Sequence, residues 1–183
     1  FFYGLFFFVF SLAAAQGLQL IDTIEKASRA ELRFFQSQIR PHFINNALNA
    51  IISISRKTPE RARRLLIDFS HYLRSSFDFI DLHRKVPIEQ ELELVKSYVS
   101  LEQARFGEQL KVNYYVEDIS IMVPPLMLQP LVENSINHGL RYKEGGGTVN
   151  IYIHRLRHSV QITVEDNGVG IKPETIKALK DPQ

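Results

Sequence analysis

The first 21 residues are mostly apolar and carry no charged side chain. A helix of about 20 such residues is long enough to cross the hydrocarbon core of a bilayer. Basic and acidic residues are mixed directly after it, with a weak excess of basic ones, which favours a cytoplasmic location for the chain from residue 22 onward. We therefore expect residues 1–21 to cross the cell membrane, with a buried or interfacial helix as the alternative. Because the chain opens at Phe1 and not at Met, we also expect further sequence before it.

From residue 22 to residue 106 the apolar positions recur with the period of an α-helix, which predicts three helices. The first extends to about Ser55, and its apolar arc is so broad that more than one partner helix must cover it. The second starts at Thr58-Pro59-Glu60, which offers an N-cap residue, a first-turn proline and a first-turn acid. The third follows Pro87 and ends near Gly107. We expect a helical bundle that completes its core by dimerising.

After residue 110 the period changes to that of a β-strand. The stretches KVNYYVE, VNIYIHRL and VQITVED alternate and are rich in β-branched and aromatic residues, which predicts three strands. A helical apolar pattern over Pro125–Leu140 lies between them. The chain is therefore predicted to be α+β, with a helical domain over residues 22–109 and a domain of mixed helices and strands over residues 110–183. The second domain looks unfinished at Gln183.

Composition excludes some classes of protein. The 183 residues are 45% hydrophobic and 23% charged, with a formal net charge of +2 and no cysteine. Disulfide frameworks and cysteine-ligated metal sites are thereby excluded. The small net charge argues against a dedicated nucleic-acid-binding protein.

The first group of residues suited to chemistry lies on the first helix. His42, Asn46 and Asn49 follow one another along a narrow polar stripe opposite the apolar arc. Pro41 removes a helical hydrogen bond and therefore kinks or restarts the helix beside His42. A neutral imidazole nitrogen is a competent nucleophile, and the two amides could hold a group attached to it. A surface or core histidine without a chemical role is the alternative.

The second group is VENSINHG, where Glu133, Asn134, Asn137 and His138 place oxygen and nitrogen ligands on adjacent helical turns. Hard oxygen ligands of this type suit magnesium that is carried with phosphates. A polar helix end capped at Gly139 is the alternative.

The third group is VEDNGVGI, in which a strand leads into Asp166 and two glycines, Gly168 and Gly170. Glycines let the backbone approach a planar ligand, and the carboxylate can accept a hydrogen bond from it. Asp-Asn-Gly is also strong turn chemistry, so a simple tight turn is the alternative.

Taken in order, QIRPHFINNALN, VPIEQELELVKSYVSLEQARF, LQPLVENSINHG and DNGVG resemble the LytS-type family of sensor histidine kinases over residues 30–171. In that family PHF carries the phosphoaccepting histidine, which is His42 here. ENxxxHG is the N box of a Bergerat-type ATP-binding domain, and DNGVG is its G1 box, so the resemblance implies that residues 110–183 form part of an α/β sandwich. The resemblance implies ATP and Mg as cofactors, a homodimer attached to a membrane sensor, and a response regulator protein as the partner that takes the phosphoryl group.

Site roles are implied by the same resemblance. It implies that Asn134 coordinates the magnesium ion on the ATP phosphates and that Glu133 and His138 line the phosphate end of the site. It also implies that Asp166 accepts a hydrogen bond from the adenine amino group. The resemblance also implies that Gly168 and Gly170 let the chain pass the base. We expect a catalytic set of His42, Asn46 and Glu133, and we add Asn137 to the nucleotide-binding residues.

Three departures from the family qualify these roles. Asn45 replaces a large apolar residue, Asn137 often corresponds to a basic one, and Phe43 follows the histidine where other histidine kinases carry a carboxylate, so the general base is open. The G2 box and the ATP lid would lie beyond Gln183, and we expect the 183-residue chain by itself to be inactive. A non-catalytic dimerising module and an ATPase that uses Glu133 remain alternatives.

Overall fold

The computed structural model describes residues 41–78, 84–140, 143 and 145–170. The chain divides into two compact units, Phe1–Pro41 and His42–Gln183, and the second contains nearly all of the described residues. The predicted membrane helix over residues 1–21 lies outside them. Within the described ranges no helix combines the length and apolar character that a bilayer crossing requires.

Three helices precede the sheet: α2 (Pro41–Ser55), α3 (Pro59–Asp78) and α4 (Ile88–Phe106). They match the three predicted helices, except that the part of the first one before Pro41 lies outside the described residues. The carbonyl of Thr58 accepts from the amides of Arg61 and Ala62, so Thr58 is the first residue of the α3 turn. Its hydroxyl lies 3.5 Å from the Ile54 carbonyl, however, and does not cap α3 as expected. The helix α4 ends at Gly107, whose φ of 61° is a conformation that glycine adopts without strain.

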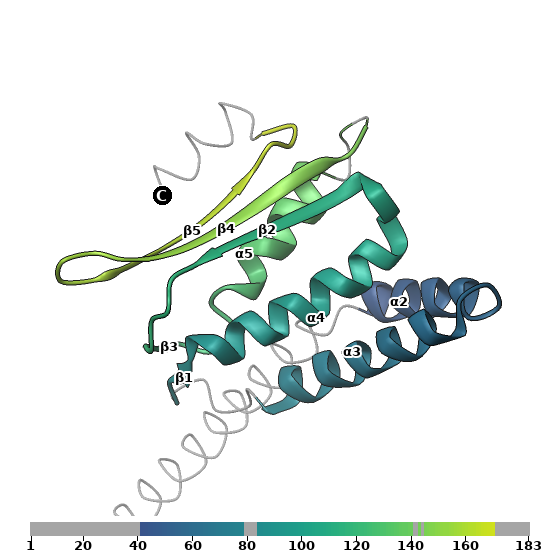
Figure 1. Ribbon diagram of the computed structural model, residues 1–183, viewed down its shortest axis with the longest axis horizontal. Coiled ribbons are helices and arrows are strands. Elements are labelled where there is room, and N and C mark those ends of the chain that lie inside the picture. The colour runs from purple at the N-terminus through teal and green to yellow at the C-terminus, as the bar shows by residue number, and fades with distance from the viewer. Residues whose placement is uncertain (1–40, 79–83, 141–142, 144, 171–183) are drawn as a thin grey trace, which may run out of the picture. The chain divides into compact units, whose positions relative to one another are not determined.

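A three-stranded sheet follows, in the order β2-β4-β5, and each strand lies where a strand was predicted. The strand β2 (Leu110–Val116) is parallel to β4 (Gly147–Arg155), which is antiparallel to β5 (Val160–Asp166). Alternate residues of β4, Val149, Ile151 and Ile153, are fully buried. Figure 1 shows α4 between the sheet and the helices α2 and α3, with α5 on the same side of the sheet as α4. The predicted α+β class is confirmed.

The helix that carries VENSINHG begins later than predicted. It consists of α5 (Gln129–Asn134) and a π-helical segment, η2 (Ser135–Leu140). A helix cannot start at Pro125, because the next residue, Leu126, has a left-handed φ of 57° that a right-handed helix does not allow. Single π-helical turns often occur at functional sites.

A pair of two-residue strands was not predicted. The strands β1 (Val86–Pro87) and β3 (Met122–Val123) pair antiparallel next to the start of α4. Two residues are too few to show an alternating pattern, so periodicity could not reveal them.

One hydrophobic core runs through the described part of the unit, from α2 to β4. The helix α4 supplies much of it, and packs against α3 on one side and against α5 and β2 on the other. The two predicted domains, residues 22–109 and 110–183, therefore share a core in this structure. Their separation at residue 110 stays a prediction.

Candidate functional site

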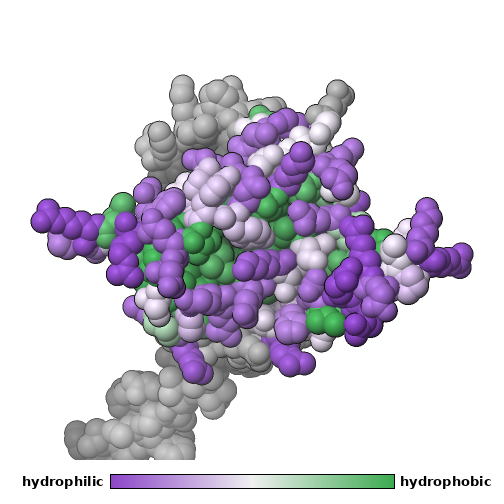
Figure 2. All heavy atoms as spheres, in the orientation of Figure 1, coloured by the Kyte–Doolittle hydropathy of each residue, from purple (hydrophilic) through white to green (hydrophobic). Residues whose placement is uncertain are grey.

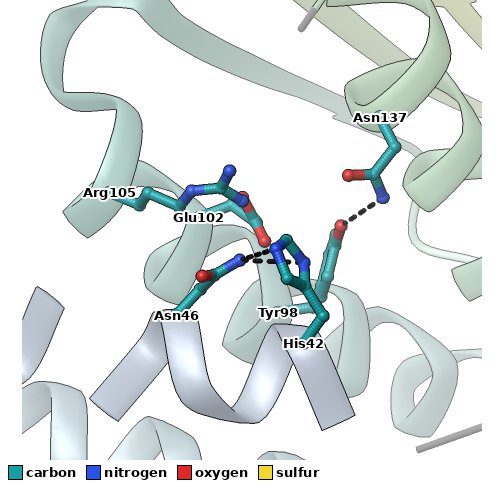
Figure 3. A network of polar contacts seen from close by, with 6 residues as sticks. All are labelled: His42, Asn46, Tyr98, Glu102, Arg105 and Asn137. Atoms are coloured by element: carbon teal, nitrogen blue, oxygen red, sulfur yellow. Dashed lines mark hydrogen bonds and ion pairs between the residues drawn. The ribbon is translucent and has the colours of Figure 1, made fainter. Parts of the chain in front are cut away.

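The imidazole of His42 is exposed at the start of α2, and Asn46 lies on it one turn later. The Asn46 Nδ2 atom is 3.1 Å from His42 Nδ1 and 3.4 Å from Nε2 (Figure 3). The predicted polar stripe continues along α2: Asn46, Asn49 and Ser53 line a groove of ≈ 270 Å³ that is shared with Arg105 of α4. The structure thus brings His42 and Asn46 into contact, and places Asn49 in the same groove as Asn46.

Phe43 anchors this end of α2. Its side chain is only 7% exposed, and its ring centroid lies 4.8 Å from that of Tyr72 on α3 and 5.0 Å from that of Tyr98 on α4. Successive residues of a helix point about 100° apart. Burial of Phe43 therefore turns His42 toward solvent.

The polar residues of α5 and η2 divide into exposed and buried ones. Asn134 and His138 are exposed, whereas Glu133 is buried. The carboxylate of Glu133 accepts a hydrogen bond from Gln129 Nε2 at 2.7 Å. The amide of Asn137 is directed at α4, where Nδ2 donates to the Tyr98 hydroxyl at 3.3 Å.

The turn after β5 packs directly on the end of η2. The Gly139 carbonyl accepts from the amide of Val169 at 2.9 Å, and the Asp166 carboxylate accepts from the amide of Gly168 at 2.9 Å. A Cβ atom on Gly168 would collide with the backbone of Gly139, and one on Gly139 would lie 2.6 Å from Asp166 Oδ1. The two predicted groups VENSINHG and VEDNGVGI therefore form one continuous surface, made possible by small residues on both sides.

These groups lie within two segments that match known protein families. The family model described as "Histidine kinase" matches residues 30–110, and the one described as "Histidine kinase-, DNA gyrase B-, and HSP90-like ATPase" matches residues 124–183. The LytS sensor protein of Enterococcus faecalis is 40% identical over 147 residues, which are 79% of this chain and 25% of that protein. The chain belongs to the LytS-type histidine kinase family.

Two further relatives match this chain over a similar number of residues. The sensor histidine kinase YpdA of Escherichia coli is 43% identical over 157 residues, 85% of this chain and 28% of its own length. The uncharacterized protein YwpD of Bacillus subtilis is 44% identical over 166 residues, 89% of this chain and 60% of its own length. The chain thus spans between a quarter and three-fifths of these three curated relatives.

Asn167, in the turn of the DNGVG segment, was not predicted to have a role. The side-chain Oδ1 of Asn167 accepts a hydrogen bond from the backbone amide of Thr148 at 2.9 Å. The backbone amide of Asn167 donates to the Thr148 carbonyl at 3.2 Å. Lys143 Nζ donates to the Asn167 carbonyl at 2.6 Å. Asn167 therefore ties the G1 turn to the start of β4. The Asp-Asn-Gly sequence predicts a turn at Asn167. It does not reveal Thr148 as the hydrogen-bond partner of Asn167, because Thr148 lies on another strand.

Glu91 of α4 is a second residue that sequence reasoning missed. It is fully buried, and its two carboxylate oxygens accept from the amides of Leu126 at 2.6 Å and Leu128 at 2.9 Å. Burial raises the pKa of the Glu91 carboxyl, although the backbone amides around it act in the opposite direction. Since α5 has no capping side chain of its own, Glu91 on α4 instead holds the backbone of the turn that leads into α5.

The residues present fit a nucleotide with magnesium. Asn134 offers an exposed amide oxygen. Among the described residues, the buried Gln129 Oε1 beside Glu133 has no hydrogen-bond partner, so a donor such as a metal-bound water could satisfy it. Gly170 has a φ of 71° and open space at its Cβ position. Of the residues that the structure describes, no three histidine, aspartate or glutamate side chains gather as a metal site.

Proposed function

We propose that this protein is a sensor histidine kinase that transfers the γ-phosphoryl group of ATP to His42 and then to an aspartate of a response regulator. The observation that carries the proposal is the exposed imidazole of His42 on a helix that is anchored, at the very next residue, against the helices that contact the N box. Family membership supports this interpretation.

In the proposed step a ring nitrogen of His42 forms a bond to the γ-phosphorus while the bond to the bridging oxygen breaks and ADP leaves with that electron pair. The other ring nitrogen keeps its proton until water removes it. We propose that Asn46, whose Nδ2 lies 3.1 Å from Nδ1 and 3.4 Å from Nε2, selects which nitrogen attacks. An amide N–H donated to Nδ1 would occupy that lone pair and leave the proton of the neutral ring on Nε2. A half-turn of the amide would hold the proton on Nδ1 and leave the Nε2 lone pair free for attack.

Nucleotide binding is assigned to the N and G1 boxes. We assign the metal contact to Asn134, the phosphate end to Glu133 and His138, and the adenine amino group to Asp166. The backbone at Gly168 and Gly170 lies beside the base in this proposal, and Asn137 contacts the phosphates if it leaves Tyr98. When bound, magnesium would neutralise phosphate charge as it does in other phosphoryl transfers.

The test is incubation of the intact protein with γ-labelled ATP. We expect label that is acid-labile and base-stable, as a phosphohistidine requires. His42→Gln should abolish it with nucleotide affinity retained, whereas Asn134→Asp and Asp166→Asn should lose both. Acid-labile label that persists on the His42→Gln protein would contradict the assignment, and His71 would be the next residue to replace.

A homodimer is part of the proposal, because α2 and α3 present apolar side chains to solvent. Ile52 is 63% exposed and Leu66 49%. The viewed face of the molecule is otherwise mostly hydrophilic, with separate apolar patches (Figure 2). This surface also favours a second candidate function, a non-catalytic module that dimerises and holds a partner. That module would give neither labelled protein nor free phosphate, and an ATPase would give free phosphate alone.

We further propose that residues 1–21 span the cell membrane and that the kinase portion is cytoplasmic, because the run is uncharged and about as long as a membrane helix. A reporter fused after Ser55 should then report the cytoplasm, and alkaline carbonate should leave the protein in the membrane fraction. Release into the supernatant would contradict this.

A further inference from the structure

Three aromatic rings, Phe43, Tyr72 and Tyr98, meet where α2, α3 and α4 converge; we call them the aromatic triad. The ring centroids of the two tyrosines are 6.2 Å apart, and each lies within 5.0 Å of Phe43. Both tyrosines are only 1% exposed. Rings at these separations pack favourably, so the triad holds three helices at one point.

The hydroxyl groups of the triad connect it to the N-box helix. The Tyr72 hydroxyl accepts from Gln129 Nε2 at 3.2 Å, and the same nitrogen donates to Glu133. The Tyr98 hydroxyl accepts from Asn137 at 3.3 Å (Figure 3). Two polar residues assigned to the nucleotide, Glu133 and Asn137, are thus joined to the triad, one through Gln129 and one directly.

These hydroxyls are not needed for packing, since phenylalanine would fill the same space. Burying a hydroxyl is unfavourable unless it is hydrogen-bonded, and here each hydroxyl accepts a hydrogen bond from the N-box helix. Burial, followed by the charges of Glu102 and Glu133, raises the pKa of Tyr98 well above its ordinary range, so the phenol stays protonated. Neutral, well-oriented hydroxyls of this kind give a specific connection between elements that are distant in sequence.

The third ring is the neighbour of the nucleophile. Because Phe43 adjoins His42 on one helix, the triad fixes the rotation of α2 and with it the direction of the imidazole. We propose that Tyr72 and Tyr98 are positioning residues, which transmit a change at Glu133 or Asn137 on nucleotide binding to Phe43 and so to His42. This inference rests on the proposed kinase function and adds to it a physical path between the two substrates.

The experiment compares the intact kinase with its Tyr72→Phe, Tyr98→Phe and doubly substituted forms. The unfolding midpoint of each form is measured first. Three quantities are then measured below the lowest midpoint: affinity for ADP with magnesium, rate of His42 labelling, and the NMR shift of the His42 imidazole when ADP with magnesium is added. The His42→Gln protein identifies that imidazole signal. Tyr114→Phe is the matched control, because Tyr114 is a half-buried tyrosine of β2 outside the triad.

We expect nucleotide affinity within about twofold of wild type and a labelling rate about fivefold lower for each single substitution, as the loss of one neutral hydrogen bond implies. The nucleotide-dependent shift of the His42 signal should be smaller in both the Tyr72→Phe and the Tyr98→Phe protein. Tyr114→Phe should change neither the labelling rate nor this shift. If Tyr98→Phe proves unstable, Tyr72→Phe tests the same coupling.

Wild-type rate and wild-type His42 shift in the doubly substituted protein would overturn the inference while leaving the kinase function intact. A fall in rate matched by an equal fall in nucleotide affinity would also overturn it, because the tyrosines would then act on the pocket itself. Absence of label on wild-type His42 would instead overturn the proposed function.

Discussion

Gly168 is the position at which a single methyl group should do most harm to the candidate nucleotide site. A Cβ there meets the backbone of Gly139, which cannot move aside as a flexible side chain could. We expect Gly168→Ala to separate the G1 turn from η2, to lower the unfolding midpoint and to abolish ADP binding, as calorimetry would show.

Gly170→Ala is its matched control. The Cβ of Gly170 would have open space, and only the left-handed φ of 71° opposes it, at about 1–2 kcal/mol. The substituted protein should therefore bind ADP more weakly than wild type yet remain folded. Equal binding by the Gly168→Ala and Gly170→Ala proteins would show that close packing at Gly139 does not matter.

The relative positions of site residues were predictable where the residues are close together in the sequence. His42 and Asn46 share a helical stripe, and Asp166 is followed by its own glycines, so local patterns placed them correctly relative to each other. Tyr72 and Glu91 could not be found that way. Each contacts its partner more than 30 residues further along the chain, and an apolar ring or a helical acid looks like any other before the fold is known.

At the scale of elements, the position of the N-box helix depends on a carboxylate from another helix. Glu91→Gln leaves one acceptor for two amides, those of Leu126 and Leu128, and sets an NH₂ group against the second. We expect a loss of about 1–3 kcal/mol in the free energy of unfolding, measured by denaturant titration. Glu89→Gln, on the exposed side of the same helical turn, should have little effect.

The difference in the free energy of unfolding between wild type and Glu91→Gln should depend on pH, because the pKa of Glu91 is raised. Between the ordinary value of 4.5 and the raised value, the folded protein binds more protons than the unfolded chain, so stability falls as the pH rises through that window. The advantage of wild type over Glu91→Gln should therefore be largest below pH 4.5 and shrink above it. A difference that grows with pH would mean that the backbone amides outweigh burial.

Elements were predicted best where the pattern is long. The helices α3 and α4 and the strands β2, β4 and β5 match their expected ranges closely. The start of α5 was misplaced because a turn with Leu126 in a left-handed conformation looks apolar and helical in sequence. Its stabilisation by Glu91 is a tertiary contact that no local pattern encodes.

For the whole molecule, the exposed apolar side chains of α2 and α3 predict self-association. Ile52→Asp places a charge at a 63% exposed position, so the fold should tolerate it while a buried dimer interface should not. We expect a shift from dimer to monomer in sedimentation equilibrium, with the circular dichroism spectrum of the folded protein unchanged. The unfolding midpoint should fall only as far as loss of the dimer requires. Val169→Asp, at a similarly exposed apolar position of the G1 turn, is the control and should leave the dimer intact.

The parallel pairing of β2 with β4 has a consequence for how the chain is made. Leu110 pairs with Gly147, so β2 has no partner strand until the segment beyond residue 147 has been synthesised. At about 5–20 residues per second, a ribosome needs roughly two to ten seconds to add residues 107–155. During that interval the face of α4 that will carry the sheet is uncovered, and closing so long a loop is intrinsically slow. Nascent chains that stall between β2 and β4 should therefore be the ones that chaperones bind and that aggregate on overexpression.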